Sequence, residues 1–181
     1  MPKRLKKLSE EVLHTNPWCV YKHDTYELPD GSEGNYYYVE STGFVKIVPV
    51  LPDGRIVLTL QHRYLQDKQS IEFPAGGIGE EETPGAAAAR EILEETGYTA
   101  EELSKVGTFE PSNSKTKSEA HIYIAQLDEE QGDQQLDPTE DIEILYRRPD
   151  ELDDMIRRGD IWDGPTLAVW AMVRHRFLET A

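Results

Sequence analysis

The chain has 181 residues and a formal net charge of −16, from 19 Lys and Arg against 35 Asp and Glu. This length suits one sizeable domain or a domain with a small appendage, and 38% hydrophobic residues are enough for a core. The negative charge argues against nucleic acids and anionic membranes as partners. A protein of this charge that acts on phosphates would need cations to bridge its carboxylates and the phosphate groups.

The cysteine content and the N-terminal segment bear on the cellular compartment. The single cysteine, Cys19, excludes an intramolecular disulfide framework, and we interpret it as a half-buried strand residue. The segment 1–12 is basic with no apolar run behind it, so we expect neither a signal peptide nor a membrane span. A reducing, cytoplasmic location is the expectation that follows.

The N-terminal part of the chain is predicted to be mostly β-structure. The basic segment 1–12 is expected to begin a short, solvated helix. Asp30 and Gly31 predict a hairpin turn. Runs rich in aromatic and β-branched residues predict strands at 18–22, 25–28, 36–40 and 44–50.

A helix is predicted in the middle of the chain, between further strands. Thr83 can cap it, Pro84 suits the first helical position, and Gly97 suits a left-handed C-terminal residue. This order of elements favours a mixed α/β layered domain over a regular βαβ repeat. Strands are predicted at 55–62, 71–75, 103–109, 120–127 and 142–147, and helices at 83–96, 149–158 and 164–179.

Glu91, Glu94 and Glu95 share one face of the predicted helix, because they are spaced i, i+3 and i+4. Their repulsion would cost the isolated helix a few tenths of a kcal/mol per pair. One interpretation is a solvated acidic stripe that Arg90 partly neutralises. The other is a carboxylate cluster that binds a hard divalent cation such as Mg²⁺. The glycines at 76–79, which allow close approach of a ligand to the backbone, favour the second.

Residues 76–98 read GGIGEEETPGAAAAREILEETGY. This segment resembles the Nudix signature at every fixed position, with Ile92 and Tyr98 in its two bulky apolar positions. The resemblance implies a Nudix-type α/β/α sandwich with a mixed sheet over residues 44–181. A small antiparallel β subdomain, residues 1–43, would precede it. In the Nudix subfamily of ADP-ribose and nucleoside diphosphate sugar pyrophosphatases, the N-terminal strands swap toward the second subunit of a homodimer.

The resemblance also implies a metal site that holds Mg²⁺ or Mn²⁺. Glu91 and Glu95 would be the main ligands, together with Glu94 and the carbonyl of Ala75. By the same resemblance, Arg90 and Glu94 would be catalytic residues. Arg90 and Glu82 would also orient the metal ligands. The alternative for Arg90 is a salt bridge without catalytic consequence.

Features outside residues 76–98 resemble the ADP-ribose and nucleoside diphosphate sugar pyrophosphatases. Arg63 lies in a Gln-His-Arg-Tyr element and would contact the diphosphate. Glu72 begins a Glu-x-Pro-Ala-Gly sequence and would help to bind substrate; the alternative is an exposed strand position. Pro111 and Ser112 lie where this group carries a marker proline, although the following residues depart from its pattern. The segment 159–166 resembles the group's C-terminal pattern.

Two further roles follow from the same resemblance. Glu140 is the candidate general base, with Asp141 and Glu143 as runners-up, and the alternative is an acidic residue at a strand entrance. Trp18 is the candidate for stacking on the nucleobase, with the tyrosines of 36–38 behind it, and the alternative is a core or interface residue.

We therefore expect a homodimeric, Mg²⁺-dependent hydrolase of small nucleotides. It would cleave ADP-ribose or a nucleoside diphosphate sugar into a nucleoside monophosphate and a sugar phosphate. Two alternatives remain open: another diphosphate substrate, such as a dinucleoside polyphosphate or an oxidised nucleotide, and a Nudix-fold ligand sensor that binds without cleaving.

Overall fold

The computed structural model describes residues 4–178 and divides the chain into two compact units. One unit contains Met1–Gly43 and Glu110–Glu119, and the other contains Phe44–Phe109 and Ala120–Ala181. The sequence did not indicate that residues 110–119 belong with the N-terminal part of the chain. No helix among the described residues is long and apolar enough to cross a membrane.

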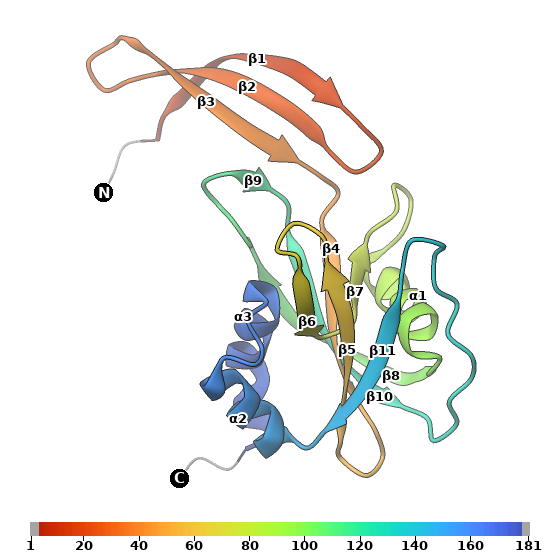
Figure 1. The fold of residues 1–181 in the computed structure, drawn as a ribbon. Helices are drawn as coiled ribbons and strands as arrows, with labels where there is room; N and C mark the ends of the chain where they lie inside the picture. Colours follow the sequence, from red (N-terminus) through yellow and green to blue (C-terminus); the bar gives the residue numbers. More distant parts are fainter. Residues whose placement is uncertain (1–3, 179–181) are drawn as a thin grey trace. The chain divides into compact units, whose positions relative to one another are not determined.

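The second unit is built around one mixed sheet with the order β11-β5-β4-β10-β8 (Figure 1). The pairing of β4 with β10 is parallel and the other pairings along this path are antiparallel. Two short strands extend the sheet, since β6 pairs with β5 and β7 with β4. The strands are β4 (Phe44–Val50), β5 (Ile56–Arg63), β6 (Lys68–Glu72), β7 (Ala75–Gly77), β8 (Ala100–Phe109), β10 (Ala120–Leu127) and β11 (Ile142–Arg147).

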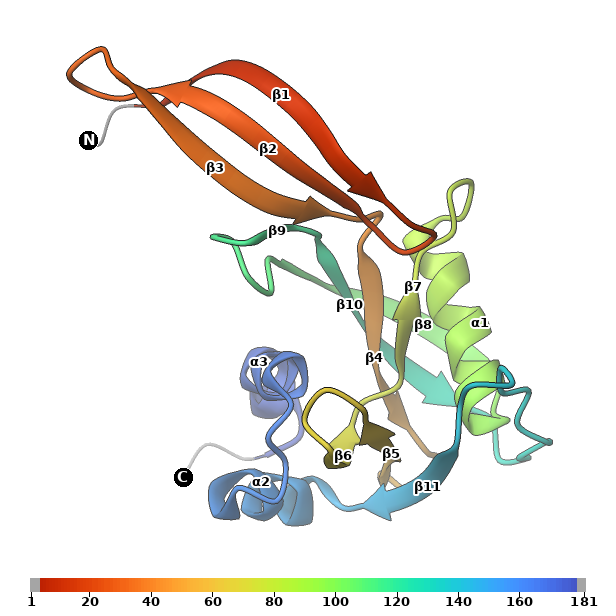
Figure 2. The same cartoon turned by 45° about the horizontal axis from the view of Figure 1, so that its top comes forward.

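Helices cover both faces of this sheet, which confirms the predicted α/β/α sandwich (Figure 2). On one face α1 (Pro84–Thr96) packs Ala87 and Ile92 into a core cluster with Ile47 of β4. The opposite face carries α2 (Pro149–Arg158) and α3 (Gly164–Val173), whose Trp170 shares a second cluster with Val48. Successive side chains of β4 therefore point to different layers, as the period of a strand requires.

Helix α1 has the ends that the sequence predicts. Thr83 Oγ1 accepts a hydrogen bond from Ala86 N at 3.2 Å, and Pro84 lies in the first turn. Gly97 ends the helix with a φ of 72° and donates its N–H to Leu93 O at 2.9 Å. A residue with a side chain would be strained at this φ, so the glycine fixes where the helix stops.

The first unit is an antiparallel sheet of β1 (Lys6–Thr15), β2 (Val20–Glu27) and β3 (Glu33–Glu40), with β9 (Thr116–Lys117) parallel to β3. The helix expected at the N-terminus is therefore wrong. The local residues suit a helix, but Lys6–Thr15 pairs with β2 and places Lys7 Nζ 3.0 Å from Asp24 Oδ2. Such partners across strands override local preference.

Several element boundaries also differ from the prediction. The strand expected at 71–75 is interrupted at Phe73 and Pro74, where the Pro74 carbonyl accepts from Ile47 N at 2.9 Å. The strands expected at 18–22 and 25–28 form one strand, β2. The last helix ends at Val173 and continues as a 3₁₀ turn over Arg174–Arg176. Residue 179, its expected end, lies outside the described residues.

Candidate active site

Gly76 and Glu91 meet where β7 lies against α1. Glu91 is 8% exposed, and a Cβ atom added to Gly76 would overlap its carboxylate. Glycine at this position therefore makes the room that the carboxylate occupies. Burial raises the pKa of Glu91, and the positive charge of Arg90 opposes that rise.

Glu95 lies one helical turn further on and is more deeply buried, at 3% exposed. Its Oε2 accepts a hydrogen bond from Ala75 N at 3.1 Å. Burial and the negative charge of Glu91 together raise the pKa of Glu95 to about 8. Two adjacent buried carboxyl groups of raised pKa need positive charge to ionise together, and carboxylate oxygens are the ligands that Mg²⁺ prefers. The residues present therefore fit a divalent cation.

Arg90 holds the outer carboxylates of this helix in place. Its Nε and Nη2 donate to the two oxygens of Glu82, both at 3.0 Å. Its Nη1 donates to Glu91 Oε1 at 2.6 Å and to Glu94 Oε2 at 2.8 Å, and Nη2 also reaches Gly77 O at 3.0 Å. The guanidinium thus ties the glycine loop to the helix. Within residues 4–178 no three carboxylate, histidine or cysteine side chains form a ready-made metal site.

Glu140 lies in the loop before β11, and its side chain is exposed. Its Oε2 accepts from Asp137 N at 3.0 Å. The negative charge of Glu140 contributes to the raised pKa of both Glu91 and Glu95, so it acts on the same carboxylate pair. The runners-up, Asp141 and Glu143, are exposed as well.

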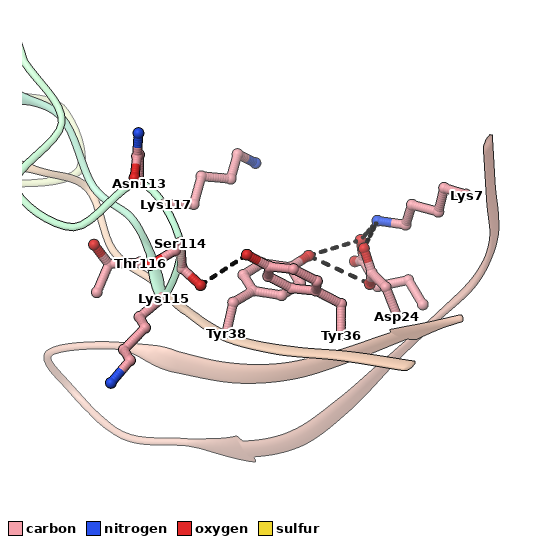
Figure 3. A pocket seen from close by; sticks show the side chains of 10 residues that line it. Lys7, Asp24, Tyr36, Tyr38, Asn113, Ser114, Lys115, Thr116 and Lys117 are labelled. Carbon is pink, nitrogen blue, oxygen red and sulfur yellow. Dashed lines mark hydrogen bonds and ion pairs between the residues drawn. The ribbon is translucent and has the colours of Figure 1, made fainter. Parts of the chain in front are cut away.

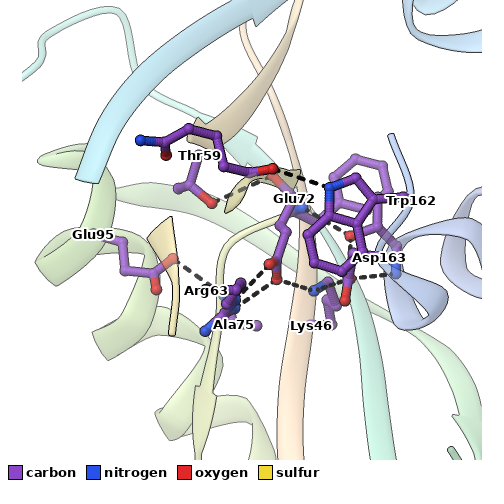
Figure 4. Close-up of polar contacts among 11 residues, drawn as sticks. Lys46, Thr59, Arg63, Glu72, Ala75, Glu95, Trp162 and Asp163 are labelled. Atoms are coloured by element: carbon purple, nitrogen blue, oxygen red, sulfur yellow. Dashed lines mark hydrogen bonds and ion pairs between the residues drawn. The ribbon is translucent and has the colours of Figure 1, made fainter. Parts of the chain in front are cut away.

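Arg63 and Glu72 form a two-point ion pair between β5 and β6 (Figure 4). Arg63 Nε and Nη2 donate to Glu72 Oε1 and Oε2, each at 2.6 Å. Glu72 is 2% exposed, so the alternative of an exposed strand position is wrong. Burial alone would raise the pKa of Glu72, but Arg63 and Lys46 outweigh it and bring the pKa down to about 2. Arg63 keeps 42% of its side chain exposed.

Lys46, which was not among the residues predicted from the sequence, lies in the apolar strand β4 and is 2% exposed. Its Nζ donates to Glu72 Oε2 at 3.0 Å and to Asp163 Oδ2 at 2.8 Å. Asp163 in turn caps α3 by accepting from Thr166 N at 2.9 Å. A single lysine within an otherwise apolar strand was the available signal.

The remaining predicted residues, Trp18, Pro111 and Ser112, belong to the first unit. Trp18 lies between β1 and β2 and is 82% exposed, so it is no part of the core of that unit. Pro111 and Ser112 open the loop that leads to β9, where Tyr36 Oη donates to Ser114 O at 2.7 Å.

The same unit contains a cavity of about 360 Å³ (Figure 3). The rings of Tyr36 and Tyr38, the side chain of Lys7 and the 113–117 loop line it. No pattern in the sequence predicted this cavity.

Comparison with known proteins agrees with this fold. A family model described as the NUDIX domain matches residues 44–169, and one described as the nucleoside diphosphate sugar hydrolase N-terminal domain matches residues 5–39. The chain therefore belongs to the Nudix hydrolase family.

Individual relatives are similar over most of the chain. The ADP-ribose pyrophosphatase of Bacillus subtilis (strain 168) is 29% identical over 158 residues, which are 87% of this chain and 85% of that protein. The methanol dehydrogenase activator of Bacillus methanolicus is 30% identical over 163 residues, 90% of this chain and 88% of that protein. A crystal structure of an ADP compounds hydrolase has the same fold, with a TM-score of 0.79 at 21% identity, and the match covers 96% of this chain and 94% of that one.

Proposed function

We propose that the protein hydrolyses the diphosphate linkage of ADP-ribose or a nucleoside diphosphate sugar, with Mg²⁺ as cofactor. The products would be a nucleoside monophosphate and a sugar phosphate. The observation that carries the proposal is the buried pair Glu91 and Glu95, whose raised pKa values make it a site short of positive charge. The similarity to the ADP-ribose pyrophosphatase of Bacillus subtilis supports this class of substrate.

Glu91 and Glu95 would hold the metal, together with Glu94 and the carbonyl of Ala75. Mg²⁺, or Mn²⁺ in its place, would screen the charge of the diphosphate and increase the acidity of water. Arg90 would keep Glu91 and Glu94 oriented, since one guanidinium already bonds both carboxylates.

Arg63 would bind the diphosphate. A guanidinium has five N–H donors, and Arg63 uses one on Nε and one on Nη2 for Glu72. The other donors lie on a partly exposed side chain, and their fork matches phosphate oxygens. Glu140 would accept the proton of the attacking water, as a general base must.

The first unit would supply nucleobase binding and dimerisation. The exposed indole of Trp18 suits stacking on a base. Pro111 and Ser112 would contribute to the substrate site, and the unit would contact the second subunit of a homodimer. The expected cytoplasmic location stays a prediction.

The test is incubation of the pure protein with Mg²⁺ and a panel of ADP-ribose, nucleotide sugars, dinucleoside polyphosphates and oxidised nucleotides, followed by identification of the products. We expect a monophosphate and a sugar phosphate from ADP-ribose or a nucleotide sugar. Preferred cleavage of another diphosphate would correct the substrate class. Tight binding of ADP-ribose without release of monophosphate would show a ligand sensor instead of an enzyme.

A second experiment compares Glu140 with the runner-up Glu143, through the matched variant Glu143→Gln in β11. Glu140→Gln should retain Mg²⁺ binding and lose turnover by about 100-fold, since a general base contributes that much or more. Near-normal turnover of this variant would remove Glu140 from the mechanism.

A further inference from the structure

Lys46 lies buried in the second unit at the centre of a polar network, and the proposed chemistry gives it no role (Figure 4). Only 3% of its side chain is exposed, and it interrupts a strand of apolar residues. Burying an ammonium group is unfavourable unless its partners compensate fully. The two partners of Lys46 are both carboxylates, Glu72 and Asp163.

Glu72 connects this lysine to Arg63. Its Oε1 accepts from Arg63 Nε, and its Oε2 accepts from both Arg63 Nη2 and Lys46 Nζ. Lys46, a buried cation, therefore fixes the orientation of the Glu72 carboxylate, and both oxygens of that carboxylate accept hydrogen bonds from Arg63. An arginine held in this way loses little conformational freedom when an anion binds it.

Asp163 anchors Lys46 on its other side. Asp163 Oδ2 accepts from Thr166 N at 2.9 Å and from Thr166 Oγ1 at 2.7 Å. Thr166 Oγ1 also accepts from Phe73 N, the residue after Glu72, at 3.2 Å. Lys46 thus closes a ring of contacts that runs from β4 to the start of α3 and back to the end of β6.

We propose that Lys46 is a positioning residue for substrate binding: by fixing the Glu72 carboxylate, it holds Arg63 ready to receive the diphosphate. The inference rests on the role proposed above for Arg63. The network pairs two carboxylates with two cations. Removal of Lys46 would leave Glu72 and Asp163 to repel each other beside one arginine, and Arg63 would lose its fixed orientation.

The experiment measures the dissociation constant of the uncleavable α,β-methylene analogue of ADP-ribose with Mg²⁺ by calorimetry. Lys46→Met should weaken binding roughly 10-fold, since a small misplacement of a binding group has effects of this order or larger. Lys46→Met alone leaves the negative charge of Asp163 without its cation. A second variant, Lys46→Met with Asp163→Asn, removes that charge, and the asparagine still caps α3. Urea unfolding should show that this double variant recovers stability.

The double variant separates positioning from a merely structural role. If Lys46 positions Glu72, the double variant still binds the analogue roughly 10-fold more weakly than the unmodified chain, although it is stable. Recovery of binding together with stability would show that Lys46 only balances charge, and would overturn the proposal.

Arg63→Gln tests whether Lys46 acts through Arg63. In that background, Lys46→Met should cause no further loss of affinity, and an equal and independent loss would overturn the proposal. Unchanged binding by Arg63→Gln alone would overturn it as well. Because the analogue is not cleaved, failure of the unmodified chain to hydrolyse ADP-ribose would count against the proposed function and not against the role of Lys46.

Discussion

Two glutamates of the second unit are almost equally buried, yet their pKa values shift in opposite directions. Glu72 is 2% exposed and Glu95 is 3% exposed, and burial alone would raise both pKa values. Arg63 and Lys46 overcome burial at Glu72 and lower its pKa to about 2. At Glu95 burial dominates, the charge of Glu91 adds to it, and the pKa rises to about 8.

The opposite shifts distinguish a carboxylate that already has its positive charge from a pair that lacks it. Glu72 has its compensating cations within the chain, so its network is complete and can hold Arg63 still. At the pair of Glu91 and Glu95, Arg90 offsets burial only in part, so further positive charge would be needed to ionise both groups. A divalent cation supplies that charge, which is why these two carboxylates, and not Glu72, are the proposed metal site.

The largest expected effect comes from Glu95→Gln. This variant keeps the shape of the side chain and an oxygen for Ala75 N, but it removes the proposed ligand. We expect turnover to fall by about 100-fold or more, because the metal stabilises the charge that develops during cleavage. The rate of monophosphate release measures this, and an unaffected rate would contradict the assignment of the metal site.

Glu72→Gln should have the opposite effect on stability from Glu95→Gln. It breaks a buried ion pair and leaves Lys46 and Arg63 without their shared partner, which should lower the free energy of unfolding by about 3 kcal/mol. Glu95→Gln should leave the metal-free protein at least as stable as the unmodified chain at pH 8. Urea unfolding of both variants without metal compares the two, and equal destabilisation would remove the contrast between the sites.

The pH dependence of stability in metal-free protein sharpens the same contrast. A carboxyl group of raised pKa binds its proton more tightly in the folded state, so the stability linked to Glu95 is lost as pH rises from about 4.5 to about 8. The loss should be about 3 to 4 kcal/mol between pH 5 and pH 8, because each pH unit in which the folded state holds one more proton contributes about 1.4 kcal/mol. The lowered pKa of Glu72 affects stability in a different pH range. Its contribution to the free energy of unfolding is lost as pH falls from about 4.5 to about 2.

Glu95→Gln is the control for this pH dependence, because it removes the group of raised pKa and leaves Glu72 in place. Its unfolding free energy should change less between pH 5 and pH 8 than that of the unmodified chain. The same slope in both proteins would contradict the raised pKa of Glu95.

The smallest effect is expected outside both carboxylate sites, at Trp18 of the first unit. Its side chain is exposed, so Trp18→Ala should change the free energy of unfolding by less than about 0.5 kcal/mol. If Trp18 stacks on the base, KM should rise about 10-fold, as the loss of one stacking contact implies. Leu13→Ala, at another exposed apolar position of the same unit, is the control and should leave KM unchanged. Equal KM values for the two variants would rule out stacking by Trp18.

Local signals in the sequence were enough to predict α1 and the carboxylates that it presents. Thr83 and Gly97 mark its ends, and the spacing of Glu91 and Glu95 places them on one face whatever the rest of the fold does. The sandwich followed from the order of strands and helices and from the resemblance.

Features that depend on long-range pairing could not be predicted in this way. The pair of Arg63 and Glu72 requires the register of β5 with β6, which local sequence does not specify. The contact of Lys46 with Asp163 joins residues that are 117 positions apart. For the same reason the helix expected to begin in residues 1–12 is wrong, because pairing with β2 decides the conformation of Lys6–Thr15.

We propose that the pair of Glu91 and Glu95 binds a divalent cation. Calorimetric titration of the metal-free protein with Mg²⁺ at pH 7 measures this binding. Titrations in buffers of different ionisation enthalpy also give the number of protons released. A carboxyl group with a pKa of about 8 is mostly protonated at pH 7, so Mg²⁺ should displace about one proton as it binds at Glu95. The release should shrink as the pH is raised above 8 and should be absent in Glu95→Gln. Saturable Mg²⁺ binding with no proton release at pH 7, or with the same release in Glu95→Gln, would contradict the account.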